Sequence, residues 1–364
     1  MAVARRRRDL DESDVRVRPN RRGTRPRSKE RPGHSDATPA WVVTVDRGRY
    51  TCLLLDPDAG PDAGPDTEAL LAATPRPVTA MKARELGRSA IVVGDRVALV
   101  GDVSGETGSL ARIVRVEPRE SALRRSADDT DPVERVVVAN ADQLAVVTAL
   151  ADPEPRPRMV DRCLVAAYDA GLSPLLILTK ADLAPAEDFL AAYAPLDVPY
   201  VITSRTRGSA EITGLNDVRQ AVRQKVTVFI GHSGVGKSTL VNALVPGADR
   251  AVGRVNDVTG RGRHTSTSAL ALALPQGGWV IDTPGVRSFG LAHVDHDRIV
   301  RAFPDLAVGT RECPRGCSHD EPECGLDAFV AHGGAGPAGE GRLESLRRLL
   351  RSRSGGDEVP TGSI

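Results

Sequence analysis

Gly-His-Ser-Gly-Val-Gly-Lys-Ser, residues 231–238, fits the pattern G-x-x-x-x-G-K-[ST] of a phosphate-binding loop. A strand-like run, 226–230, precedes it, and a helical pattern over 237–245 follows. The glycines allow the backbone N–H groups to point inward and form an anion site at a helix N-terminus. We expect Lys237 to reach the β- and γ-phosphates and Ser238 to bind Mg²⁺. The other expected nucleotide contacts in the loop are Gly231, His232, Ser233, Gly234, Val235, Gly236 and Thr239.

Two further motifs occur in an unusual order. Asp282-Thr-Pro-Gly285 follows an apolar run and is typical of a Mg²⁺ and γ-phosphate site, in which Asp282 holds Mg²⁺ through its water shell and Gly285 donates its N–H. Thr179-Lys-Ala-Asp182 is a variant of the Asn-Lys-x-Asp guanine motif, which ordinarily comes last. Here it precedes the phosphate loop by about fifty residues. This order predicts a circularly permuted GTPase, which folds tolerate because domain termini commonly lie close together.

The base motif selects the nucleotide. The Asp182 carboxylate can accept hydrogen bonds from guanine N1–H and N2–H₂, whereas adenine would leave it unpaired, so GTP and GDP are the expected ligands. The stem of Lys180 is expected to lie along the base. Thr179 replaces the usual Asn, so a bridging hydrogen bond to the phosphate loop is not assured. Ser204, after the strand-like run 199–203, is expected in the loop that contacts guanine O6.

The segment 259–267 lies where a GTPase has a mobile switch. Thr265 is the expected sensor of the γ-phosphate and Mg²⁺, with Thr267 as the alternative. Val286 follows the Asp-x-x-Gly motif where Ras-like enzymes have a Gln that orients water. His264 is therefore the candidate for that catalytic role, because a neutral imidazole can orient water. The alternative is a histidine on a surface loop.

Four potential metal ligands lie within twelve residues near the C-terminus: Cys313, Cys317, His319 and Cys324. A Cys₃His set closes a tetrahedral Zn²⁺ site with no open position, so one structural zinc ion is expected. The remaining two of the five cysteines stand alone, which favours a cytosolic metal site over a disulfide framework.

Charge and composition limit the remaining possibilities. The 364 residues carry a net charge of +1, but residues 1–32 hold twelve Lys/Arg and five Asp/Glu. This N-terminal segment is either a solvated tail or a basic arm for phosphate-rich partners. It has no apolar core of a secretory signal, and no run of apolar residues approaches the length of a membrane span. A cytoplasmic protein without membrane contact is expected.

The pattern of predicted strands and helices indicates an α/β protein with several domains. Short β-rich runs at 41–45, 50–55, 90–93, 96–100 and 111–116 favour a small Greek-key barrel, an OB-fold rather than an SH3-like barrel. Alternating strands and helices then favour a doubly wound GTPase domain. The expected organisation is a disordered basic tail (1–38), a barrel (39–120), a permuted GTPase domain (133–292), a helical zinc-binding domain (293–353) and a disordered tail (354–364).

Taken together, these motifs resemble those of the bacterial small ribosomal subunit biogenesis GTPases. The resemblance spans about residues 40–350 and rests on the permuted order, 231–238, 262–265, 282–285, the Cys₃His cluster and Val138-Ala-Asn-Ala-Asp142. It implies an OB-fold, a permuted GTPase and a zinc domain. It also implies hydrolysis of GTP that is accelerated by the 30S subunit, contact with 16S rRNA through the OB-fold and zinc domain, and a role for His264 in hydrolysis. A monomer is expected. The chain departs from the family at Thr179 and in its Cys spacing, which is about one residue shorter in each of two gaps.

Two other classes of protein remain to be weighed. A small-molecule kinase or ATPase would share the phosphate loop, but Asp182 argues against it. An RNA-binding protein with a degenerate nucleotide fold is disfavoured by intact Lys237, Ser238 and Asp282.

Overall fold

The computed structural model describes residues 34–55, 77–87, 90–125, 135–206, 208–209, 211–246, 269–283, 291 and 294–353. The chain divides between Ser35 and Asp36, and all elements below lie in the second unit. Several predicted features fall outside the described residues: His264, Thr265, Gly285, the segment 259–267 and nearly all of both tails.

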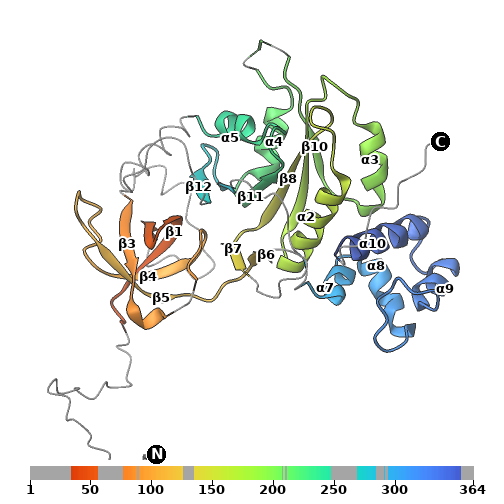
Figure 1. The fold of residues 1–364 in the computed structure, drawn as a ribbon, viewed down its shortest axis with the longest axis horizontal. Coiled ribbons are helices and arrows are strands. Elements are labelled where there is room, and N and C mark those ends of the chain that lie inside the picture. Colours follow the sequence, from red (N-terminus) through yellow and green to blue (C-terminus); the bar gives the residue numbers. More distant parts are fainter. Residues whose placement is uncertain are drawn as a thin grey trace, which may run out of the picture. The chain divides into compact units, whose positions relative to one another are not determined.

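Five strands form an N-terminal barrel (Figure 1). They are β1 (Thr38–Asp46), β2 (Arg49–Leu54), β3 (Val78–Lys82), β4 (Arg96–Gly101) and β5 (Ala111–Val116), with the 3₁₀ helix η2 (Arg84–Leu86) after β3. Their order is β1-β2-β3-β5-β4, and β4 pairs back onto β1. The β3–β5 pair is parallel and the other pairs are antiparallel. This closed Greek-key arrangement confirms the predicted barrel.

The barrel differs from the sequence prediction in two details: the run 90–93 is not a strand, and β3 was not among the predicted strands. Within the run 90–93, only Val93 forms an isolated bridge, to Val138. The Asp95 carboxylate accepts a hydrogen bond from the Val92 N–H (2.8 Å) and folds the run into a turn. Gly94, between this run and Asp95, has a φ of +93°. A Cβ at this position would lie 1.9 Å from the Ala139 carbonyl oxygen. The segment therefore docks against the start of the GTPase region, whereas the short strand β3 supplies the barrel position.

A largely parallel sheet follows the barrel. Its order is β10-β9-β8-β11-β13-β12, and only β12 is antiparallel to its neighbour. Its strands are β8 (Gln143–Ala149), β9 (Ser173–Thr179), β10 (Tyr200–Ile202), β11 (Val226–Gly231), β12 (Leu270–Ala273) and β13 (Trp279–Asp282). Strands β8 and β11 are buried along their whole length, as expected for central parallel strands between covering helices. The doubly wound α/β prediction is confirmed.

Helices cover this sheet, and a two-stranded ribbon leads into it. The helices are α2 (Pro157–Ala170), α3 (Glu187–Tyr193), α4 (Leu215–Val222) and α5 (Lys237–Leu244), with η3 (Ala194–Leu196) after α3, and the ribbon is β6 (Ala122–Arg125) and β7 (Arg135–Ala139). Helix α2 begins with a proline, whose fixed φ suits the first helical turn. It ends at Ala170, and the next residue, Gly171, has the left-handed φ of 71° common after helices.

The C-terminal region is helical. It contains α7 (His296–Arg301), α8 (Pro304–Ala307), η4 (Val308–Glu312), α9 (Gly325–Ala331) and α10 (Gly339–Arg353). The predicted apolar face of α10 is buried, with Leu343, Leu346 and Leu350 at most 6% exposed. This helix packs against α2 of the GTPase region (Figure 1). Among the described residues, no helix has the length and apolar character needed to cross a membrane.

Candidate nucleotide and metal sites

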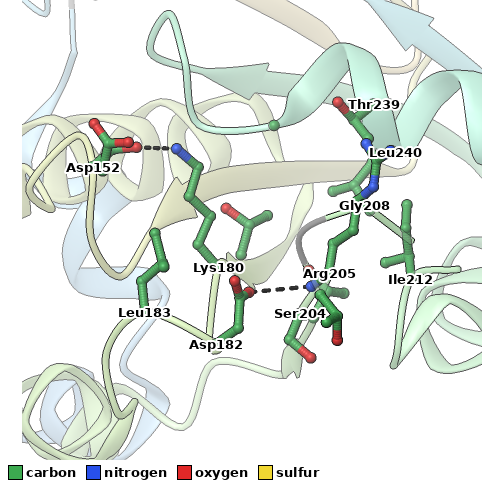
Figure 2. Close-up of a pocket in the computed structure, with 14 residues that line it drawn as sticks. Asp152, Lys180, Asp182, Leu183, Ser204, Arg205, Gly208, Ile212, Thr239 and Leu240 are labelled. Carbon is green, nitrogen blue, oxygen red and sulfur yellow. Dashed lines mark hydrogen bonds between the residues drawn. The ribbon is translucent and has the colours of Figure 1, made fainter. Parts of the chain in front are cut away.

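The predicted nucleotide motifs meet at one edge of the sheet. Strand β9 ends at Thr179, β11 at Gly231 and β13 at Asp282. Because parallel strands present their carboxyl ends at the same edge, the base motif, the phosphate loop and the Mg²⁺ motif converge there. Part of this edge is a cavity of about 630 Å³ (Figure 2). It is lined by residues of the base motif, the segment after β10 and the start of α5, including Lys180, Asp182, Ser204, Arg205, Gly236 and Thr239.

The phosphate loop has the backbone that its glycines predict. A Cβ at Gly231 would lie 2.6 Å from the Val147 carbonyl oxygen, so only glycine lets the loop leave the sheet there. Gly234 and Gly236 have left-handed φ values of 85° and 91°. Lys237 is then the first residue of α5, and Ser238 and Thr239 follow it on the exposed side of the helix start. Within the loop, His232 Nδ1 lies 2.8 Å from the Ser233 carbonyl oxygen.

The lysine of the loop pairs with the aspartate of the Mg²⁺ motif. The Lys237 ammonium donates a hydrogen bond to the Asp282 carboxylate. Both groups are only partly exposed, at 11% and 29% of their side chains. A bound phosphate would replace the carboxylate as the partner of Lys237, and Asp282 would then be free to interact with a hydrated cation. The next residue, Thr283, anchors this turn by donating to the Phe229 carbonyl oxygen (2.9 Å).

The base motif faces the loop after β10. The Asp182 carboxylate accepts a hydrogen bond from the backbone N–H of Arg205 (3.1 Å), and Figure 2 shows the two side by side. The Lys180 ammonium donates to the Asp152 carbonyl oxygen, so its stem extends along one side of the cavity. An acceptor carboxylate beside a backbone donor complements an edge that presents N–H groups next to a carbonyl, as guanine does.

Arg205 lines the cavity but was not among the residues predicted from the sequence. Ser204, the predicted residue, lines the cavity, but its own backbone pairs with Thr213: the Ser204 N–H donates over 3.3 Å and its carbonyl accepts over 2.9 Å. The N–H beside Asp182 therefore belongs to the following residue. A backbone donor leaves no signature in the side-chain sequence. Its position directly after Ser204 was the only available signal.

Thr179 supplies the link to the phosphate loop that its replacement of Asn put in question. Its hydroxyl lies 2.6 Å from the Val235 carbonyl oxygen and 3.3 Å from that of Thr148. The hydroxyl has one hydrogen to donate, and the shorter distance favours Val235 as its acceptor. Because Thr179 is only 5% exposed, this hydrogen bond is shielded from water and ties the base-reading segment to the phosphate loop.

The four predicted zinc ligands lie together. Their candidate ligand atoms are all within 4.8 Å of one another. Cys313 Sγ is 3.5 Å from His319 Nδ1 and 3.8 Å from Cys324 Sγ, and the Cys324 Sγ–His319 Nδ1 distance is 3.8 Å. With Zn–S bonds of about 2.3 Å and a Zn–N bond of about 2.0 Å, ligand atoms at the corners of a tetrahedron are roughly 3.5–3.8 Å apart. The cluster therefore fits a closed zinc site despite its shortened spacing.

The surroundings of the cluster hold its ligands in place. The Cys317 thiol donates to the Glu321 carboxylate (3.0 Å), and the Ser318 N–H donates to the same carboxylate (3.0 Å). Burial and the hydrogen bond to Glu321 raise the pKa of the Cys317 thiol to about 11. A bound metal would displace this proton, since the thiolate is the ligand. On the other side, the Arg347 guanidinium donates to the His319 carbonyl oxygen (3.0 Å).

Comparison with known proteins identifies the family. Residues 116–292 match the RsgA GTPase family model. The small ribosomal subunit biogenesis GTPase RsgA of Pseudomonas aeruginosa is 39% identical over 271 residues, which cover 72% of this chain and 76% of the relative. The chain belongs to the RsgA GTPase family. RsgA of Gemmatimonas aurantiaca is 38% identical over 275 residues, covering 74% of this chain and 87% of that protein.

Solved structures agree with this RsgA-type fold. The crystal structure of YjeQ from Thermotoga maritima matches with a TM-score of 0.57 and 25% identity, covering 88% of this chain and 99% of that chain. The structure of YloQ, a circularly permuted GTPase, matches with a TM-score of 0.55 and 22% identity, covering 88% and 97%. The second likeness concerns the fold alone, and it agrees with the permuted order of motifs in this chain.

Proposed function

We propose that this RsgA-family chain hydrolyses GTP to GDP and phosphate while assisting late maturation of the 30S ribosomal subunit. The observation that carries the proposal is the Asp182 carboxylate beside the Arg205 N–H, across a cavity from a complete phosphate loop. Guanine would replace the internal hydrogen bond, donating N1–H and N2–H to Asp182 and accepting at O6 from Arg205. The relatives named as small ribosomal subunit biogenesis GTPases supply the assembly role.

We assign the hydrolytic roles to residues of the phosphate loop, the Mg²⁺ motif and the segment between them. Lys237 would stabilise charge on the transferring phosphoryl group, because a fixed ammonium is most effective where negative charge accumulates. Ser238 and Thr265 would bind Mg²⁺, Asp282 would act through its water shell, and Gly285 would contact the γ-phosphate. His264 would orient the attacking water. His264, Thr265 and Gly285 lie outside the described residues, so their roles rest on the sequence.

The other regions would serve the ribosomal partner. We propose that the barrel (39–120) and the zinc domain (293–353) contact 16S rRNA around the GTPase domain (133–292), in a monomer that acts in the cytoplasm. The Cys₃His cluster would hold one structural Zn²⁺. Zinc supplies no chemistry to hydrolysis in this scheme; its four protein ligands would close the coordination sphere and fold the loop that carries them.

The test of this function is GTP turnover by the purified chain, with and without 30S subunits. We expect slow turnover alone and a marked acceleration by 30S subunits. Asp182→Asn should shift binding from GTP towards xanthosine triphosphate, because the new amide can donate to the xanthine 2-oxo group. A variant that keeps its GTP preference would show that the base is read elsewhere, and a wild-type rate unaffected by 30S subunits would contradict the ribosomal role.

The same assay separates the two candidate catalytic residues. Lys237→Ala should reduce turnover by orders of magnitude, with or without 30S subunits. His264→Ala should retain GTP and 30S binding but lose only the stimulated rate. If 30S subunits accelerate the His264 variant as much as the wild type, the water must be placed by another group.

A further inference from the structure

We propose that helix α10 couples the zinc site to the guanine end of the nucleotide pocket. In this proposal Arg342 and Arg348 are positioning residues for the base-reading segment, residues 179–182. The proposal rests on the proposed function, since it concerns the affinity of that pocket for a guanine nucleotide. Its basis is that arginines of one helix contact two segments. On one side they bond the zinc loop, residues 313–324, and on the other side they bond α3 and η3, which follow the base motif.

On the zinc side, Arg347 bonds the backbone of one candidate ligand, His319, and the helix α9 that follows another, Cys324. Its Nε donates to the carbonyl oxygen of His319 (3.0 Å). Its Nη1 and Nη2 donate to the two carboxylate oxygens of Asp327 (2.9 and 2.7 Å), which lies in the first turn of α9 just after Cys324. Such a two-pronged pair fixes both direction and distance. The zinc loop is thereby fastened to α10.

On the GTPase side, two arginines hold the end of α3 and the start of η3. Arg342 Nη1 donates to the Pro195 carbonyl oxygen (2.9 Å), and Arg348 Nη1 donates to that of Ala192 (2.9 Å). The Arg348 guanidinium also lies 4.8 Å from the centroid of the Tyr193 ring. At Gly341 the helix passes so close that a Cβ would lie 3.3 Å from Pro195 Cγ. The two elements are therefore in tight contact.

An ion pair with a buried carboxylate strengthens this contact. Arg348 Nε lies 3.2 Å from the carboxylate of Asp161 on α2, whose side chain is only 5% exposed. Burial raises the pKa of Asp161, and the positive charge of Arg348 opposes that rise. A carboxylate in this position costs free energy unless the arginine stays beside it. Helix α10 therefore cannot shift relative to α2 and α3 without an energetic penalty.

Two short routes lead from this contact to Lys180. Only residues 183–186 separate Asp182 from α3, and the Leu183 N–H donates back to the Lys180 carbonyl oxygen (2.9 Å). By the second route, the Tyr193 hydroxyl donates to the carbonyl oxygen of Pro157, the first residue of α2 (3.2 Å). The loop before α2 contains Asp152, whose carbonyl oxygen accepts the Lys180 ammonium. Both routes end at the lysine that flanks the base.

The direction of the coupling follows from these contacts. Neighbouring residues on a helix point in different directions, so Arg347 contacts the zinc loop while Arg348 contacts α3. A displacement of the zinc loop that moves α10 therefore also moves the donors bonded to α3. Zinc would hold His319 and Cys324 in the arrangement in which the His319 carbonyl oxygen and Asp327 accept hydrogen bonds from Arg347 of α10. Zinc binding should therefore raise the affinity for guanine nucleotides, and a guanine nucleotide should raise the affinity for zinc by the same factor.

The test uses the full chain and a fluorescent N-methylanthraniloyl derivative of GDP. Its Kd is measured for zinc-loaded and chelator-treated protein, and the zinc Kd is measured with and without saturating GDP. We expect both affinities to change by one common factor, within about 5–150-fold. Equal nucleotide affinities with and without zinc would overturn the coupling. A zinc-loaded chain that fails to bind GDP would instead contradict the proposed function.

Variants test the path in zinc-loaded protein, which retains the metal-bound loop. Arg342→Ala and Arg348→Lys should each weaken GDP binding at least threefold, the latter because an ammonium cannot reproduce the planar set of guanidinium donors. The matched control is Arg298→Ala. It removes another arginine contact to the GTPase region, from α7 to Asp169 at the far end of α2 (3.2 Å), and should leave the GDP Kd unchanged. Wild-type Kd values in both test variants would exclude α10 as the path.

Discussion

The arginines of helix α10 and two arginines of the barrel strands, Arg49 and Arg112, have opposite surroundings. On α10, four arginines each donate to a carboxylate or a carbonyl group of the same chain: Arg342, Arg347, Arg348 and Arg351. On the barrel, Arg49 and Arg112 flank Met81 in register across β2, β3 and β5, and all three are exposed. Within the described part of the chain, neither of these two guanidinium groups has an ion-pair or hydrogen-bond partner.

This difference shows that a basic segment is not by itself a surface for nucleic acid. An arginine that already satisfies a buried carboxylate cannot leave it without a penalty, whereas an unpaired arginine can exchange its water and counterions for phosphate oxygens. We therefore expect the arginines of α10 to contribute mainly to stability, and Arg49 and Arg112 mainly to RNA contact. Three predictions test the contrast.

The largest loss of stability is expected for Arg348→Ala, which leaves the buried Asp161 without its partner. Breaking such a pair typically costs about 3–5 kcal/mol, and we expect about 3 kcal/mol because the Arg348 side chain is 33% exposed. Denaturant unfolding monitored by circular dichroism measures the change. A loss below about 1 kcal/mol would mean that α10 is not held by this pair.

An intermediate loss is expected for Arg347→Ala. The guanidinium bonds the Asp327 carboxylate and the His319 carbonyl oxygen, but the Asp327 side chain is 46% exposed and regains water. We expect about 1.5 kcal/mol, the lower end for hydrogen bonds to charged groups. Arg351→Ala is the control. Its ion pairs with Asp320 and Glu344 involve a guanidinium side chain that is 54% exposed, and should contribute at most about 1 kcal/mol. Equal losses in the two variants would contradict this ranking.

The smallest change in stability is expected for Arg49→Ala and Arg112→Ala, each within about 0.5 kcal/mol. Their effect should appear in RNA binding instead. Log K for 30S binding falls with log salt, and each substitution should make this fall less steep, reducing the magnitude of the slope by about 1. Arg115→Ala on the same strand as Arg112 is the control, because its guanidinium is already paired with Glu117 (2.7 Å). Unchanged slopes in both test variants would remove these two arginines from the RNA contact.

The sequence predicted those parts of the molecule whose geometry depends on local chemistry. Strand β11, the phosphate loop and the start of α5 follow from an apolar run, obligatory glycines and a helix N-terminus. The zinc cluster could be predicted because its ligands are close in the chain, and a tetrahedron tolerates a shorter spacing between them. In both cases the residues that make the site also determine its backbone.

The remainder depends on contacts between distant segments. The run 90–93 has the apolar pattern of a strand, but the bonds of Asp95 and the close approach of Gly94 to Ala139 make it a turn. The role of the Arg205 N–H required the position of β10 beside β9. Likewise, the heptad-like leucines of α10 showed which face is buried. They could not show that Arg342 and Arg348 reach carbonyl groups about 150 residues away.

Strand β1 belongs to two structures at once. It closes the barrel against β4, and at Thr44 it also pairs with Leu270 of β12, the last strand of the GTPase sheet. The barrel therefore covers a sheet edge that would otherwise offer free backbone groups to another chain. Exposed edges of this kind promote aggregation. A shortened chain that starts after the barrel would lose the cover of its GTPase sheet as well. Its β12 edge would be open to self-association, and its behaviour would be a poor guide to the GTPase domain in the intact protein.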